Sequence, residues 1–466
     1  MDCRTRHPTG AVAILMATAL VGCQSYQPRP LELAAYRQAW QRRDVTDASV
    51  AAFAEQLEAR EGVELEHFDP TDGLSLAEAE VVALWFNPDL RVARRRANVA
   101  EAGQREAGWW EDPELNVDAL RVLESVSEPW ILGGGVSLTV PLSGRLAVER
   151  DQAAARWDLA RWEAAVAEWR LRVALREAWL HWSAQQRQAE LLDRYVDRVG
   201  TIAEAAESLV EAGELSTVEA RVLRLELARR RIEHRQVEAE VERLQLDLLA
   251  TLGLVPDAPV KLEPALEVAD VQPRGERRRA ALLNHPELRR AEATYALAEQ
   301  NLHREIRRQY PDLTIGPRYS HEEGQSRLGV GAGLPLPLWN RNRQGIAEAE
   351  AEREQARVEA EAAIEALTAR LAQLEHRRRE ARTRREALRR EVAPVAEAQM
   401  REVEQLIELG ELEILLWQDA LTRDLEVRQA LLDAALDEAL AASTLRELVQ
   451  PRLSLPHRDT TRESSR

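Results

Sequence analysis

Two very long segments of the chain have apolar residues at helical spacing. Between Arg145 and Ala212 there is no proline, and apolar side chains recur every three or four residues, as in AVAEWRLRVALREAWLHW. This pattern predicts one continuous helix, roughly 100 Å long at 1.5 Å per residue. The segment from Asn342 to Leu409 shows the same pattern, with Pro394 as the expected kink. Helices of this length exceed what a compact domain needs.

Four shorter segments alternate apolar and polar residues, which predicts strands with one apolar face. They are PELNVDAL, PWILGGGVSLTVPL, PDLTIGPRYS and RLGVGAGLPLPLW. A soluble hairpin packed on a core would give the same alternation. Aromatic residues flank the segments, as at a membrane interface, and these are Trp109, Trp110, Trp130, Tyr310 and Trp339. This placement favours strands that cross a membrane.

Four strands per chain do not close a membrane barrel, which needs at least about eight. An open edge in lipid would leave unpaired backbone groups, each costing several kcal/mol. If the strands span a membrane, the barrel is therefore shared between chains. Glycine, serine, threonine and asparagine on the second face suit a wide, water-filled interior.

The chain contains an internal repeat. NPDLR at Asn87 matches HPELR at His285, and GVSLTVPL at Gly135 matches GVGAGLPL at Gly329. EAGELSTVEA likewise matches ELGELEILLWQDA. Each motif recurs about 200 residues later and in the same order, so the chain is two copies of one unit.

The repeat predicts the domain organisation. Each copy begins with a helix, about Ser75 to Ala107 and Glu276 to Arg308, followed by two strands and a long helical hairpin. The expected segments are a signal peptide (1–22), a lipidated N-terminal extension (23–73), repeat 1 (74–254), a proline-rich linker (255–275), repeat 2 (276–450) and a disordered tail (451–466).

Composition adds two exclusions. The net charge of −17 argues against nucleic acid as a partner. After the N-terminal apolar run no stretch of about 20 apolar residues follows, so no transmembrane helix is expected.

The N-terminus predicts export and lipidation. Arg4 and Arg6 precede an uncharged apolar run from Gly10 to Leu20, which is typical of a signal peptide. Leu20-Val21-Gly22-Cys23 resembles the bacterial lipobox, which implies an acylated Cys23 as the first mature residue. Gln24 in place of Asp implies sorting to the outer membrane. An ordinary signal peptide with an incidental cysteine is the alternative.

The ordered set of motifs resembles the TolC-like outer-membrane efflux protein family, over about residues 74–450. LPLPLWNRNRQGIAEAEAE (Leu334 to Glu352) is similar to the branch that works with heavy-metal pumps. The resemblance implies a mainly α-helical chain whose four strands join a trimeric twelve-stranded barrel, continued by a long helical periplasmic tunnel. It implies a passive exit duct, anchored in outer-membrane lipid, that docks a periplasmic adaptor and an inner-membrane transporter.

The resemblance also assigns site residues. The adaptor-docking tips map onto Gly213, Glu214, Leu215, Gly410, Glu411 and Leu412. Glu219 and Asp419 map onto carboxylates that ring the tunnel mouth. The alternative is that both are solvated carboxylates on helix surfaces. Some members hold the gate shut with an arginine where this chain has Leu412, so that lock is absent or replaced.

Enzymatic chemistry is not expected. The sequence has no nucleophile elbow, HExxH, P-loop or CxxC motif. No metal site or cofactor is expected beyond the lipid on Cys23, and HEEG at His321 fits an external loop better than a metal site. The basic run from His376 to Arg390 fits a solvated helix face. The rival function is a lipid-anchored coiled-coil tether, and the cargo of a duct stays open between metal cations, drugs and polypeptides.

Overall fold

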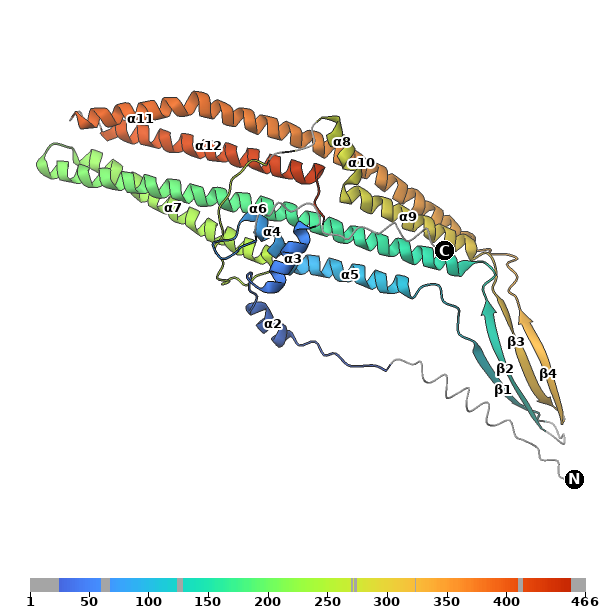
Figure 1. The fold of residues 1–466 in the computed structure, drawn as a ribbon. Helices are drawn as coiled ribbons and strands as arrows, with labels where there is room; N and C mark the ends of the chain where they lie inside the picture. Colours follow the sequence, from blue (N-terminus) through green and yellow to red (C-terminus); the bar gives the residue numbers. More distant parts are fainter. Residues whose placement is uncertain are drawn as a thin grey trace. The chain divides into compact units, whose positions relative to one another are not determined.

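The computed structural model describes residues 25–59, 68–123, 129–269, 271, 275–322, 324–409 and 414–453. The chain divides into two compact units, Met1–Arg43 and Asp44–Arg466. In the first unit, helix α2 (Leu33–Gln41) has no buried residue. All other described helices and strands belong to the second unit (Figure 1).

The strands form one antiparallel sheet in the order β1-β2-β3-β4 (Figure 1). Their bounds are β1 (Glu114–Arg121), β2 (Trp130–Val140), β3 (Leu313–Glu322) and β4 (Gln325–Gly333). Each repeat gives one hairpin, and β2 pairs with β3 to join the two repeats. Within the described residues the outer edges of β1 and β4 have no strand partner, so the sheet is open.

Over most of its length the register gives the sheet one apolar and one polar face, as the alternation predicted. Toward the hairpin ends of the strands, Arg121, His321 and Ser326 share the apolar face, and Leu120 and Ile131 share the polar face. Leu115 pairs with Val136, and Tyr319 pairs with Leu328. The apolar face holds Leu115, Val117, Trp130, Leu132, Val136, Leu138, Val140, Leu313, Ile315, Tyr319, Leu328 and Val330. The polar face holds Glu114, Asn116, Asp118, Gly133, Gly135, Ser137, Thr139, Thr314, Gly316, Arg318, Ser320, Arg327, Gly329 and Gly331. Leu328 is 82% exposed, so the apolar face is uncovered in one chain.

One glycine, Gly316, allows β2 and β3 to approach each other closely. A Cβ atom on Gly316 would lie 1.8 Å from the Val136 carbonyl oxygen. The neighbouring Pro317 has no N–H to donate, and regular pairing is interrupted between Gly135–Arg318 and Leu138–Ile315. Only glycine fits at position 316 without moving the backbone.

The two long helical hairpins confirm the main helical prediction. Helix α6 (Arg145–Ala212) has 68 residues and the predicted bounds, and α7 (Thr217–Leu252) packs along it. The second hairpin consists of α10 (Arg343–Ala387), η3 (Leu388–Val392), α11 (Ala393–Glu408) and α12 (Ile414–Val449). The η3 segment is a π-helical turn just before Pro394, which has no N–H for the regular helical bond.

The prediction of one continuous helix at the start of each repeat is wrong. Repeat 1 has α4 (Leu76–Phe86) and α5 (Pro88–Arg105), and repeat 2 has α8 (Glu276–Ala281), η2 (Leu282–Asn284) and α9 (Pro286–Arg307). Pro88 and Pro286 each begin a new helix, since proline disfavours helical geometry in the residue before it. Asn87 and His285 accept a backbone N–H as N-caps, at 3.0 Å and 3.2 Å.

Helix α6 contacts α5, α7, α9 and α12 and so links the two repeats. Three buried clusters hold the helices together. The first joins α3 (Ala48–Glu58), α4, the middle of α6 and the end of α7. The second lies toward the hairpin ends and joins α6, α7, α11 and α12. The third lies within repeat 2, around Leu371 and Leu445.

Among the described helices, none combines the length and the apolar character that crossing a membrane requires.

Candidate functional site

The first hairpin turn is built around Gly213. Its φ of +77° lies in the left-handed region, which L side chains disfavour. The N–H of Gly213 donates to the Val210 carbonyl at 3.1 Å, and the N–H of Glu214 donates to the Leu209 carbonyl at 2.9 Å. These two bonds form a Schellman motif that ends α6. The predicted tip glycine therefore lies at the turn between α6 and α7.

Glu219 is held at the start of α7. Its carboxylate accepts hydrogen bonds from the Ser216 hydroxyl at 2.7 Å and the Ser216 N–H at 3.2 Å. The Ser216 hydroxyl oxygen accepts the Glu219 N–H at 3.3 Å, which completes a capping box. These bonds from Ser216 to the ionised form lower the pKa of Glu219. The predicted mouth carboxylate thus stays charged and has a local structural role.

Asp419 lies near the start of α12 and is half-exposed. Arg423, one turn further along, contacts its carboxylate at 2.8 Å. Asp419 and Glu219 are therefore each bound to a residue of their own helical segment. That both face a tunnel stays a prediction, because a tunnel needs more than one chain.

The second tip residues Gly410, Glu411 and Leu412 lie outside the described residues, as does Cys23. Helix α11 ends at Glu408 before these tip residues, and α12 begins at Ile414 after them.

A polar contact that the sequence did not predict joins the repeats near the hairpin ends. The Tyr195 hydroxyl of α6 lies 3.1 Å from the Thr422 hydroxyl of α12 and 3.4 Å from the Glu226 carboxylate of α7. Arg230 pairs with Glu226 at 2.7 Å and covers the Tyr195 ring at 5.1 Å. The helical pattern could place Tyr195 in the core, but its partner Thr422 comes from the other repeat.

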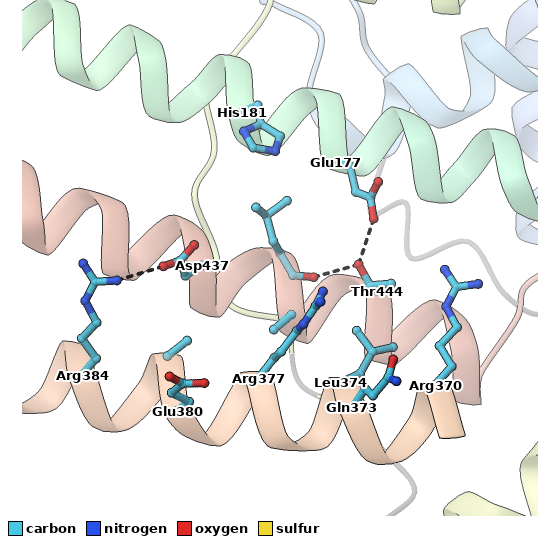
Figure 2. A pocket seen from close by; sticks show the side chains of 13 residues that line it. Glu177, His181, Arg370, Gln373, Leu374, Arg377, Glu380, Arg384, Asp437 and Thr444 are labelled. Atoms are coloured by element: carbon cyan, nitrogen blue, oxygen red, sulfur yellow. Dashed lines mark hydrogen bonds and ion pairs between the residues drawn. The ribbon is translucent and has the colours of Figure 1, made fainter. Parts of the chain in front are cut away.

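A cavity of about 590 Å³ lies between the two hairpins (Figure 2). Helix α6 supplies Glu177 and His181, and the opposite side comes from α10 and α12. The Thr444 hydroxyl donates to the Glu177 carboxylate at 3.1 Å. Arg384, from the basic run on α10, pairs with Asp437 at 3.3 Å. The lining carries both signs of charge, which favours no single class of ion.

A buried ionic cluster fixes the repeats together deeper in the molecule. Arg172 contacts the Glu80 carboxylate at 3.2 Å, and Arg452 contacts it at 3.1 Å. Arg176 bridges Glu80 and Glu447. Burial acts to raise the pKa of Glu80, but these three guanidinium groups outweigh it and lower the pKa to about 2. The cluster connects α4, α6, α12 and the segment after α12.

The other motifs form local structure. Asn342, in the LPLPLWNRNRQG segment, has a φ of +51°, and its amide donates to the Glu305 carbonyl at 2.8 Å. His321 and Glu322, the first two residues of HEEG, belong to β3 and not to a loop, and the His321 ring lies 3.3 Å from the Ser326 hydroxyl. Among the described residues there is no group of three or more metal-binding side chains.

The molecule is similar to a known family and to several solved structures. The family model described as "Outer membrane efflux protein" matches residues 82–254 and 278–449, one segment in each repeat. No curated protein sequence matches the chain.

Three solved structures share its fold. OprN, an outer-membrane channel, is 18% identical, covers 91% of this chain and 98% of its own length, and has a TM-score of 0.69. CusC, which forms a transmembrane channel, is 17% identical and has a TM-score of 0.69. The match covers 83% of this chain and 95% of CusC. VceC, an outer membrane protein of Vibrio cholerae, is 17% identical and has a TM-score of 0.66. The match covers 79% of this chain and 95% of VceC.

Proposed function

This chain belongs to the outer membrane efflux protein family, and from that premise we propose that it is the exit duct of a tripartite efflux system. Three copies share one barrel of twelve strands and one helical tunnel. The duct is a passive conductor and not an enzyme. It receives its cargo from a periplasmic adaptor and an inner-membrane transporter.

The observation that carries the proposal is the open four-stranded sheet with one apolar and one polar face. An uncovered apolar face with residues as exposed as Leu328 suits lipid. The polar face, with Asn116, Arg318 and several glycines, suits a water-filled interior. Unpaired edges at β1 and β4 would be costly in lipid unless another copy pairs with them.

The finer parts of the proposal rest on the sequence. Acylation of Cys23 would add a lipid anchor to the outer membrane, and the hairpin turn at Gly213 would dock the adaptor. Metal cations are the proposed cargo, because Leu334 to Glu352 resembles the heavy-metal branch of the family. Drugs and secreted polypeptides are the alternatives.

The test is permeability. The purified full-length protein, reconstituted in liposomes, should admit small sugars and produce swelling in an osmotic assay. A coiled-coil tether would leave the liposomes sealed, and sealed liposomes containing correctly inserted trimer would reject the duct.

A further inference from the structure

The apolar face of the sheet changes character toward the hairpin ends of its strands. Leu132 and Val140 lie on this face of β2, about 27 Å apart at 3.4 Å per residue. Such a length covers most of the apolar band, about 25 Å tall, of a membrane barrel with tilted strands. At Leu132 and beyond it, the same face carries Arg121, His321 and Ser326. The apolar band therefore ends in a group of polar residues.

Aromatic side chains mark the boundary between the apolar band and these polar residues. Trp130 of β2 lies directly opposite Arg121 of β1, and Tyr319 of β3 lies two residues before His321. Trp130 is 53% exposed and Tyr319 is 47% exposed. Tryptophan and tyrosine gather where the hydrocarbon of a membrane meets the lipid headgroups. We call Arg121, Trp130, Tyr319, His321 and Ser326 the hairpin-end patch.

The hairpin-end patch offers hydrogen-bond donors and contains no carboxylate. The Tyr319 hydroxyl lies 2.9 Å from the Ser326 hydroxyl, which lies 3.3 Å from Nδ1 of His321. The Arg121 guanidinium lies 5.8 Å from the centre of the Trp130 ring. In the part of the chain that the structure describes, no carboxylate pairs with Arg121.

The acidic residue next to the patch in β3 lies on the other face of the sheet. Glu322 follows His321, and successive residues of a strand point to opposite faces. On the polar face Glu322 pairs with Arg327 at 3.1 Å. The two arginines at this end of the sheet therefore differ, because Arg327 has a carboxylate partner on the polar face.

The other end of the sheet treats its arginine in the opposite way. Arg145, at the start of α6, contacts the Glu111 carboxylate at 2.7 Å and the Asp312 carboxylate at 3.0 Å. Glu111 and Asp312 lie just before β1 and β3. The charge of Arg145 is thus neutralised within the chain, whereas the charge of Arg121 suits an anion from outside it.

The arrangement of the chain places the hairpin ends at the cell exterior, given the proposed function. The opposite ends of the strands join helices, since α5 precedes β1, α6 follows β2 and α10 follows β4 (Figure 1). In the proposed duct these helices form the periplasmic tunnel. The hairpin-end patch then lies at the level of the headgroups in the outer leaflet of the outer membrane.

We propose that the hairpin-end patch binds the phosphate-bearing headgroups of outer-leaflet lipid. Arg121 supplies the charge, because a guanidinium group holds phosphate oxygens through paired, charge-assisted hydrogen bonds. Tyr319, His321 and Ser326 supply further hydrogen bonds, and the adjoining apolar face holds the acyl chains. The inference rests on the proposed function, since it needs the hairpin ends to lie outside the cell.

Two copies of the chain complete this site. The strands β1 and β4 are the open edges of the sheet, so closing a ring places β1 of one copy about 4.8 Å from β4 of the next. Both strands have their hairpin ends at the same end of the sheet. Arg121 of one copy therefore lies on the strand beside Ser326 of the next, whereas β2 and β3 separate the two residues within one chain.

Native mass spectrometry of the purified full-length trimer in neutral detergent tests the site. The probe is lipid A, a phosphorylated glycolipid, and the reference ligand is its dephosphorylated form. The parent should bind lipid A about fivefold more than the reference, as one arginine contributes near an anionic headgroup. Arg121→Gln should abolish this preference. Arg327→Gln, the matched control, removes a charge from the polar face at the same end and should bind like the parent.

A second variant and a competitor keep the test independent of folding and of free anions. Arg121→Lys keeps the charge but loses the planar guanidinium, so it should retain a preference between those of the parent and of Arg121→Gln. Inorganic phosphate at the concentration of lipid A should not displace the lipid, because it has no acyl chains for the apolar face to hold.

Failure of this inference differs from failure of the proposed function. Equal binding of the two forms of lipid A overturns the inference, as does an equal loss in Arg121→Gln and Arg327→Gln. Displacement of lipid A by inorganic phosphate also overturns it, since the ligand would then be a free anion. If the same trimer admits sugars into liposomes, these outcomes keep the duct. Binding that depends on Arg121 in trimers that leave liposomes sealed supports the site and rejects the duct.

Discussion

His285 caps a helix in repeat 2 at the position where Asn87 caps one in repeat 1. Its imidazole is fully buried and makes an edge contact with Trp169 at 4.6 Å between ring centroids. Burial lowers the pKa of His285, Glu287 opposes the shift and Arg370 adds to it, so that the pKa is about 4. The neutral ring therefore accepts the Glu287 N–H at neutral pH.

The first prediction follows from this pKa. Because the pKa is about 4 in the folded state and about 6.5 in the unfolded state, the stability from neutral His285 is complete above pH 6.5. It is lost as the pH falls toward 4, by about 3 kcal/mol. His285→Asn keeps an N-cap and should flatten this pH dependence in urea unfolding followed by circular dichroism. His376→Asn, at an exposed position, should keep the slope of the parent.

The second prediction concerns the mouth carboxylates. Glu219→Gln preserves a capping box, since glutamine serves at this position, so it removes charge without removing the helix start. Combined with Asp419→Asn, it should lower the cation selectivity of single channels, and more so at low salt. A reversal potential equal to that of the parent would assign both carboxylates to the solvated outer surface.

At the scale of elements, the turn at Gly213 yields the third prediction. A Cβ atom there meets nothing within 4 Å, so the cost of substitution comes from the positive φ alone. Gly213→Val should strain the turn by about 1–2 kcal/mol. It should spare membrane insertion but weaken cross-linking to the adaptor and reduce efflux. Gly103→Val, at an exposed helix position, is the control. Equal efflux in both variants would show that the turn does not dock the adaptor.

The sheet yields the fourth prediction from two adjacent residues on opposite faces. Leu328→Arg would place a charge on the apolar face, at a cost of about 2–4 kcal/mol near the middle of a bilayer. Gly329→Arg would place the same charge on the polar face, where no atom lies within 4 Å of the new Cβ. Only Leu328→Arg should reduce the fraction of the protein that stays in the membrane when membranes are washed with urea. Equal resistance would show that the faces are assigned wrongly.

The spacing of apolar residues predicted those helices and strands whose pattern runs without interruption along one stretch of the chain. The bounds of α6 followed from an uninterrupted helical pattern that ends at Gly213. The break between α4 and α5 was missed because apolar residues continue across Asn87 and Pro88. The bond from Tyr195 to Thr422 could not be predicted, since their meeting depends on how two hairpins pack.

At the scale of the whole molecule, the ionic cluster around Glu80 holds the two repeats together. Glu80→Gln would leave buried guanidinium groups without their partner and should lower the free energy of unfolding by about 3–5 kcal/mol. Because the pKa of Glu80 is lowered to about 2, its contribution is complete above pH 4.5 and lost as the pH falls through 2.

The Glu80 variant should therefore lose the pH dependence of stability in this acidic window. Glu354→Gln removes an exposed ion pair with Arg357 and should have a far smaller effect. If both variants unfold at the same urea concentration, the cluster does not hold the repeats together.

The central claim is that the polar face of the sheet lines a water-filled pore while the apolar face meets lipid. The most direct measurement is single-channel conductance before and after a water-soluble, charged thiol reagent. Ser320→Cys lies on the polar face, and Leu328→Cys lies on the apolar face. The reagent should reduce the current stepwise through Ser320→Cys and leave the current through Leu328→Cys unchanged. Unchanged current in Ser320→Cys, or block in Leu328→Cys alone, would contradict the claim.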